Sequence, residues 1–211
     1  MLNHDVKKER KDLYAPKAGE FVIVDVPEMP FLMVDGHGDP NTAPPYTEAV
    51  EALYTTSYTV RALAKARLEK VHTVAPLEGL WSADDWEVFR TREKSAWDWT
   101  MMIAQPDWIT GDLVDDALKA AEKKAAAKKK ELPALERVRF APYAEGRSVQ
   151  ILHRGPYDDE GPTLRRLHDE FLPAQGLEPV GRHHEIYLSD PRKTEPAKLR
   201  TILRQPVTDA S

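Results

Sequence analysis

Residues 77–82, LEGLWS, and residues 184–189, HEIYLS, are two short apolar segments that share one pattern. Each has a glutamate in second place and a serine in last place, so that Glu78 stands opposite Glu185. Aromatic and aliphatic residues in so short a segment favour a strand over a helix. The match is a first indication that the chain contains one structural motif twice.

Other segments repeat in the same order. A constant offset of 117 residues relates the loop and helix of the first half to those of the second, pairing Gly38 with Gly155, Pro45 with Pro162, Val50 with Leu167 and Tyr54 with Phe171. Further on, IAQP (103–106) matches LRQP (203–206). Several matches in one order, over segments of the same predicted type, are typical of an internal duplication. We therefore expect repeats at about 20–106 and about 137–207.

The two repeats are predicted to contain the same elements. Each begins with a β-hairpin, continues with a helix and ends with two strands. In the first repeat these are strands 21–26 and 31–35, helix 46–69, and strands 76–81 and 97–103; in the second they are strands 138–143 and 148–153, helix 163–171, and strands 183–189 and 199–207. A helix over 111–131, with Asp112 as its N-cap, should connect them. The prediction is a single α+β domain: a pseudo-two-fold sheet, helices on one side, and a ligand groove between the halves.

Composition excludes several classes of function. The chain has 211 residues, 41% hydrophobic and 31% charged, which is typical of a globular protein. It contains no cysteine, so it has no disulfide, thiolate metal site or cysteine nucleophile, and this favours a reducing, cytoplasmic setting. The charged N-terminal segment lacks the apolar core of a signal peptide, and no apolar run is long enough to span a membrane. A net charge of −5 argues against nucleic-acid binding. The oligomeric state stays open.

Glu185 is the first candidate functional residue. It interrupts HHEIYL, a segment otherwise suited to a buried strand, and alternation places it on one face with Tyr187 and His183. A partly desolvated carboxylate is costly unless paired, and such groups mark functional sites. The alternative is a glutamate on an edge strand that points into water or forms a salt bridge with Arg200 or Arg204.

Aromatic residues cluster around the same predicted strands and helices. Together with Met101, they suggest a groove that would bind flat amphipathic or cationic molecules by ring stacking and cation–π contacts. The candidates are Trp81, Trp99, Met101 and Tyr54 in the first repeat, and Tyr157 and Tyr187 in the second. The alternative for Trp97 and Trp99 is a core position, because Met101 and Ile103 share their face. Flat aromatic compounds should bind in the micromolar range or more weakly, and should quench tryptophan fluorescence.

Neither a metal nor a cofactor is predicted. His183 and His184 are adjacent, so on a strand they point to opposite faces, and the other histidines lack ligand spacing. GHGDP (36–40) has no third glycine and no lysine of a phosphate-binding loop. We interpret it as a turn between strand and helix.

Long stretches of the sequence resemble stand-alone GyrI-like small-molecule-binding proteins. The resemblance rests on FVIVDVPEMPFLMVDGHGDPN (21–41) and WDWTMMIAQPDWIT (97–110) in the first half, and on VQILHRGPYDDEGPTL (149–164) and HHEIYLSDPRKTEPAKLRTILRQPV (183–207) in the second. It implies a duplicated fold with a ligand cleft, similar to the drug-binding domains of multidrug-responsive transcription activators. In those domains a buried glutamate among aromatic rings receives cationic drugs, and Glu185 matches its position.

The resemblance leaves several functions open. The first is binding, and hence sequestration, of amphipathic aromatic or cationic molecules. The second is hydrolysis of cyclopropane-bearing, DNA-alkylating natural products, with Glu185 as general base and either Tyr157 or Tyr187 bonded to the carbonyl that gains charge. A weaker third is a protein-interaction module that acts on a partner such as DNA gyrase. Turnover would separate the first from the second.

Overall fold

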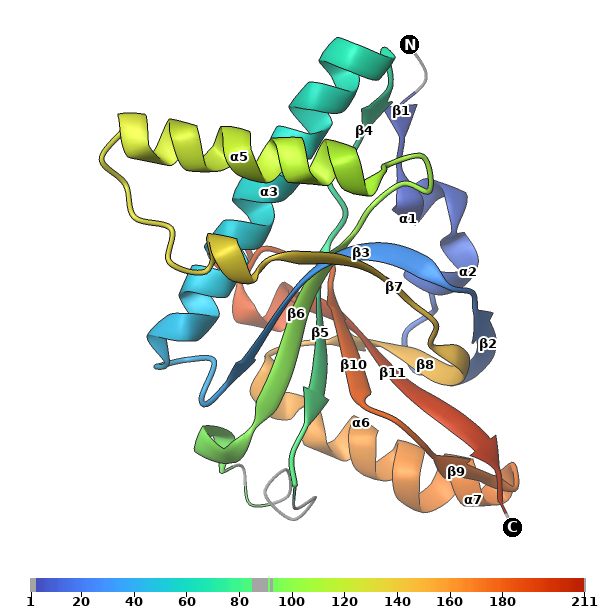
Figure 1. Ribbon diagram of the computed structural model, residues 1–211. Helices are drawn as coiled ribbons and strands as arrows, with labels where there is room; N and C mark the ends of the chain where they lie inside the picture. The colour runs from blue at the N-terminus through green and yellow to red at the C-terminus, as the bar shows by residue number, and fades with distance from the viewer. Residues whose placement is uncertain (1–2, 85–90, 92, 211) are drawn as a thin grey trace. The chain divides into compact units, whose positions relative to one another are not determined.

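The computed structural model describes residues 3–84, 91 and 93–210, and the chain divides into two compact units (Figure 1). Unit 1 comprises residues 1–9 and 29–143, and unit 2 comprises residues 10–28 and 144–211. The chain therefore passes from one unit to the other after residues 9, 28 and 143, and each unit contains segments from both predicted repeats.

Unit 1 contains an antiparallel sheet. Its strands follow the order β5-β6-β3-β7, with the bounds β3 (Met29–His37), β5 (Leu77–Ser82), β6 (Asp98–Ala104) and β7 (Arg139–Tyr143). Three of these strands contribute side chains that are completely buried, among them Leu32, Val34, Leu80, Met101 and Ile103. Burial of these apolar side chains is the main stabilising contribution to this unit.

The long helix α3 (Pro44–Leu68) packs against β3 and β6. It begins two residues before the predicted start because Pro44 and Pro45 occupy its first turn, where proline needs no N–H partner and its fixed φ suits a helix. The predicted apolar face is confirmed through Ala64, whereas Leu68, at the C-terminal end, is exposed.

Helix α5 (Gly111–Ala127) packs against α3 within unit 1. Thr110 is its N-cap, and the Thr110 hydroxyl accepts a hydrogen bond of 3.4 Å from the backbone N–H of Leu113. The prediction that Asp112 would be the cap is therefore wrong. Asp112 lies in the first turn instead, where its charge still complements the helix dipole.

Short elements complete unit 1. The N-terminal strand β1 (Asn3–His4) pairs in parallel with β4 (Val71–His72), and β1 is followed by the helical turn α1 (Val6–Glu9). Two 3₁₀ turns, η1 (Lys94–Ala96) and η2 (Leu135–Arg137), precede β6 and β7. These elements are too short to give a periodic signal in the sequence.

The strands of unit 2 are also antiparallel. The order is β2-β8-β11-β10, with the bounds β2 (Val22–Val26), β8 (Gly146–Arg154), β10 (His183–Tyr187) and β11 (Arg200–Asp209); β9 (Leu177–Pro179) also pairs with β11. The short helix α2 (Lys11–Tyr14) precedes β2, and η5 (Pro196–Lys198) precedes β11. The order β10-β11-β8 matches β5-β6-β3 of unit 1, as duplication predicts.

The predicted helix 163–171 is part of a longer helical segment in unit 2. After the turn η3 (Tyr157–Asp159) come α6 (Gly161–Arg165), the π-helical turn η4 (Arg166–Phe171) and α7 (Leu172–Ala174). Pro173 has no N–H to donate to the carbonyl four residues earlier, which favours a widened turn at this place. Leu167 and Leu172 pack with residues of β8, β9 and β11, namely Val149, Leu177 and Val207.

Neither predicted hairpin forms. β2 pairs with β8 rather than with β3, and β3 pairs with β7 rather than with β2. A tight hairpin turn needs residues with positive φ. The connection 27–28 contains none, and in the predicted turn 144–147 only Gly146 has one. Each predicted hairpin therefore opens, and its two strands contribute to different units. The repeat boundaries and their union in one domain stay predictions.

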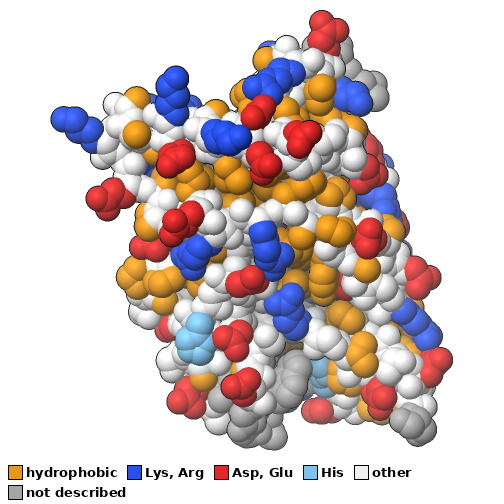
Figure 2. Space-filling model, viewed as in Figure 1, with side chains coloured by type: hydrophobic (Ala, Val, Ile, Leu, Met, Phe, Trp, Pro, Cys, Tyr) orange, Lys and Arg blue, Asp and Glu red, His pale blue; other side chains and the backbone are white. Residues whose placement is uncertain are grey.

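No helix in the described residues is long and apolar enough to cross a membrane. On the face of the molecule drawn in Figure 2, Lys and Arg side chains alternate with Asp and Glu side chains and do not gather into one basic patch.

Candidate functional site

Strand β10 presents Glu185 and Tyr187 on one face of the unit 2 sheet. Tyr187 Oη donates a hydrogen bond of 2.8 Å to Glu185 Oε2, as the alternation of the strand predicts for residues two apart. His183 lies on the same face, with its Nε2 3.7 Å from Glu185 Oε1. The side chain of Glu185 is 16% exposed, so the carboxylate is partly desolvated but can still be reached.

Tyr157 joins this cluster from the turn η3. Its ring meets that of Tyr187 edge to face, with the centroids 5.6 Å apart. Burial, and then the negative charges of Glu185, Glu160 and Asp190, raise the pKa of Tyr157 to about 12. The phenol therefore keeps its proton at neutral pH. Its hydroxyl has no hydrogen-bond partner in the described part of the chain, so it can donate to a bound molecule.

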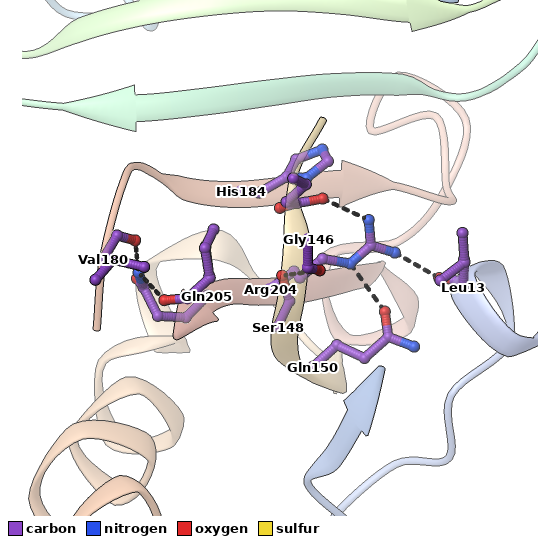
Figure 3. Close-up of polar contacts among 10 residues, drawn as sticks. Leu13, Gly146, Ser148, Gln150, Val180, His184, Arg204 and Gln205 are labelled. Carbon is purple, nitrogen blue, oxygen red and sulfur yellow. Dashed lines mark hydrogen bonds and ion pairs between the residues drawn. The ribbon is translucent and has the colours of Figure 1, made fainter. Parts of the chain in front are cut away.

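Arg204 does not pair with Glu185. Its guanidinium donates to Glu145 Oε2 at 3.0 Å, to Gln150 Oε1 at 3.0 Å and to the backbone carbonyl of Leu13 at 2.8 Å (Figure 3). Arg204 and His184 are opposite each other in the β10–β11 register, and His184 Nδ1 lies 2.9 Å from Glu145 Oε1. These three side chains, at most 2% exposed, form a buried charged network.

The network holds Glu145 in its ionised form. Burial alone would raise the pKa of Glu145, but His184 and Arg204 beside it lower the pKa to about 2. Arg204 also fixes α2 on unit 2 through the Leu13 carbonyl. The sequence placed Glu145 in a turn and gave no sign of this partnership, which joins residues 59 positions apart.

The other predicted site residues belong to unit 1. Trp99 and Met101 are almost completely buried there. The ring of Trp99 lies so close to Gly36 that a side chain at Gly36 would overlap it, and Trp99 Nε1 donates to the carbonyl of Gly38 at 3.2 Å. Trp81 stacks against Tyr46, with centroids 6.3 Å apart, and Tyr46 also contacts Trp99. A ligand-binding role for these residues stays a prediction.

Tyr54 lies on α3 and stacks against Tyr58, with the centroids 6.4 Å apart. A cavity of about 360 Å³ lies nearby between α3 and α5, lined by residues that include Thr55, Tyr58, Ala121, Lys124 and Leu132. None of the predicted site residues lines this cavity. The structure therefore brings together Glu185, Tyr187 and Tyr157, and it adds His183 to them.

The described residues contain no group of three or more His, Asp or Glu side chains that could hold a metal ion. The chemistry of the Glu185 cluster is that of a carboxylate, two phenols and an imidazole. Such a set can bind a cation, accept a proton from water or donate a hydrogen bond to a carbonyl.

Comparison with known proteins agrees with the fold. Residues 19–208 match the model of the GyrI-like small molecule binding domain. The chain belongs to the GyrI-like family. The match covers both predicted repeats, and it identifies the protein as a small-molecule-binding domain. No relative was found among curated proteins.

Three solved structures match this chain over nearly its whole length. A crystal structure of an uncharacterized conserved protein from Listeria innocua is 39% identical, with a TM-score of 0.88, over 98% of this chain and 100% of the other. Two crystal structures of a hydrolase from Listeria innocua, one described as encoded by lin2189, are 38% and 37% identical, with TM-scores of 0.84 and 0.83 and the same coverage.

Proposed function

We propose that this GyrI-like protein binds amphipathic aromatic molecules, with a preference for cations, at the cluster of Glu185, Tyr187 and Tyr157. The observation that carries the proposal is the partly buried Glu185 carboxylate, held by the Tyr187 hydroxyl beside a second phenol ring. A bound cation would gain the charge of Glu185 and the faces of the tyrosine rings. The absence of cysteine accords with a cytoplasmic setting, where such binding would sequester toxic compounds.

Isothermal titration with a matched pair of ligands tests this proposal. The pair is a polycyclic aromatic quaternary ammonium ion and its uncharged carbon analogue. We expect the cation to bind in the micromolar range or more weakly, a free energy of about −8 kcal/mol or less favourable. The neutral analogue should bind more weakly than the cation. Equal affinities, or no heat from either ligand, would exclude a charge-selective aromatic site.

Hydrolysis is the second candidate, and the two hydrolase structures that match 98% of the chain favour it. Glu185 would take a proton from a water molecule whose oxygen bonds to a carbon of a strained, electrophilic cyclopropane ring. The ring C–C bond would break, and its electron pair would move to a conjugated carbonyl oxygen. That oxygen would accept a hydrogen bond from Tyr157, and it would take up the proton after Glu185 releases it.

The structure favours Tyr157 over Tyr187 as this hydrogen-bond donor. The hydroxyl of Tyr187 is already bonded to Glu185, whereas that of Tyr157 is available and stays protonated. Incubation with a cyclopropane-bearing alkylator, followed by mass analysis for the adduct of one water, distinguishes the two candidates. A binder retains one equivalent unchanged, and a hydrolase converts many.

A further inference from the structure

His183 is buried beside Glu185 and makes no hydrogen bond of its own. The residue is 7% exposed, and neither ring nitrogen has a hydrogen-bond partner within the described residues. A buried polar group without a partner costs about 1–3 kcal/mol of stability. The ring is held by its place in β10, next to His184 and two positions before Glu185. Both ring nitrogens are almost completely enclosed by protein, so only a molecule as small as water could satisfy them.

The distance between His183 and Glu185 defines a position for that molecule. Nε2 of His183 and Oε1 of Glu185 are 3.7 Å apart, which is too long for a direct hydrogen bond. The other carboxylate oxygen, Oε2, already accepts a hydrogen bond from Tyr187. One oxygen atom placed to the side of this pair could contact both Nε2 and Oε1 at ordinary hydrogen-bond distances of about 2.8 Å.

The charge state and tautomer of His183 follow from its surroundings. Burial, and then the nearby His168 and His184, lower the pKa of His183 to about 3, so that the ring is neutral at pH 7. A neutral imidazole carries one N–H and one lone pair. A lone pair on Nε2 would face the carboxylate and be repelled by it, whereas an N–H there is attracted. The proton therefore belongs on Nε2.

We propose that His183 is a positioning residue that, together with Oε1 of Glu185, holds the water molecule consumed in the hydrolysis. The Nε2–H donates to one lone pair of the water oxygen, and one hydrogen of the water points to Oε1. The second lone pair then faces the substrate carbon. When Glu185 takes the proton, this lone pair forms the new C–O bond. The inference rests on the hydrolytic candidate function.

Two substitutions of His183 test this role. In His183→Gln the side-chain amide N–H lies near the place of Nε2–H, and in His183→Asn it lies near the place of Nδ1. We expect His183→Gln to retain kcat within about fivefold, and His183→Asn to lose about 100-fold in kcat with KM within twofold, because a misplaced reactant costs about that much. Thermal unfolding of both variants controls for folding. Equal kcat in the two folded variants would overturn the inference.

A second measurement does not depend on turnover. Long-range ¹H–¹⁵N imidazole spectra of the full-length protein should show His183 as the neutral Nε2–H tautomer at pH 7, and Glu185→Gln should shift its Nε2 resonance. The His184 resonances, set by Glu145, are the internal control. A protonated ring, the Nδ1–H tautomer, or no response to Glu185→Gln would refute the role of His183. If the wild type converts no alkylator, hydrolysis fails as a function, and the spectra alone decide whether His183 and Glu185 share a bound water.

Discussion

Glu78 in β5 is completely buried. Its counterpart in β10 is Glu185, and the side chain of Glu185 is 16% exposed. The two glutamates occupy the same place in the segments LEGLWS and HEIYLS, and in strands with the same position in the sheet order of each unit. One carboxylate therefore lies in a core and the other beside two phenols. Of the two, Glu185 is the one whose side chain is accessible.

Glu185→Gln should weaken binding of the aromatic cation and leave the neutral analogue nearly unchanged. The loss is one partly desolvated charge interaction of about 1–3 kcal/mol, or roughly 5- to 150-fold in Kd. If the protein is a hydrolase, turnover should disappear while substrate binding persists, because the amide cannot take a proton from water. Folding should survive, since the neutral isostere is cheaper to bury. Titration calorimetry and thermal unfolding measure both effects.

Glu78→Gln is the matched control for this substitution. Because Glu78 is buried in unit 1, we expect its replacement to alter thermal unfolding and to leave the affinity for the cation unchanged. Equal cation affinity and turnover for wild type and Glu185→Gln would make Glu185 an ordinary surface residue.

The two tyrosines should differ in their effect on turnover. Tyr157→Phe removes the hydroxyl that is available to the substrate, and kcat should fall by about 10²- to 10³-fold, as for other donors that stabilise developing charge. Tyr187→Phe removes a hydrogen bond to Glu185 and should reduce kcat less than tenfold. Steady-state kinetics of the two variants gives the ranking. The opposite ranking would assign the carbonyl contact to Tyr187.

Breaking the buried network in unit 2 should destabilise the protein strongly. Glu145→Gln leaves the Arg204 guanidinium without its charge partner in a buried place, a change that costs about 3–5 kcal/mol of unfolding free energy. Arg204→Met should cost a similar amount because it leaves Glu145 uncompensated. The double variant should lose less than the sum of the two, since no isolated charge remains. Urea unfolding of the four proteins completes this cycle, and additive losses would contradict the pairing.

Acid should destabilise the protein below about pH 6.5. Burial lowers the pKa of His183 to about 3 and that of His72 to about 4, from an ordinary value of 6.5. At pH values between each folded-state pKa and 6.5, the unfolded chain binds a proton on that histidine and the folded protein does not. Stability is therefore complete above pH 6.5 and is lost as the pH falls toward the folded-state pKa values, by up to about 1.4 kcal/mol per pH unit for each ring.

Urea unfolding at pH 7, 6 and 5 measures this slope. Glu145, with an ordinary pKa of 4.5 and a folded-state pKa of about 2, contributes to this slope mainly below pH 5. His72→Phe should flatten the slope by the share of one histidine, because a phenyl ring takes no proton and can keep the edge contact with Trp108. A slope identical to that of the wild type would show that His72 titrates normally.

Local periodicity was sufficient to predict much of this fold. The apolar spacing of α3 and the alternation of β10 are properties of short segments, so both could be predicted, and with them the shared face of Glu185 and Tyr187. The pairing of the strands could not be predicted, because the alternation within one strand does not specify which strand lies beside it. For the same reason the Glu145–Arg204 pair was missed: its members are distant in sequence, and one lies in a connection. The neutral, buried state of His183 depends on packing that no motif encodes.

The crossed pairing of β2 with β8 and of β3 with β7 has a consequence for the origin of the protein. A single repeat holds both strands of one opened hairpin, but it has no second copy with which to exchange them. If the two halves derive from one ancestral segment, that segment would reproduce this pairing by exchanging its first strand with a second identical chain. The repeat hypothesis thus points to an ancestral homodimer with exchanged strands. Fusion of two copies would make the exchange intramolecular and leave Glu78 and Glu185 to diverge.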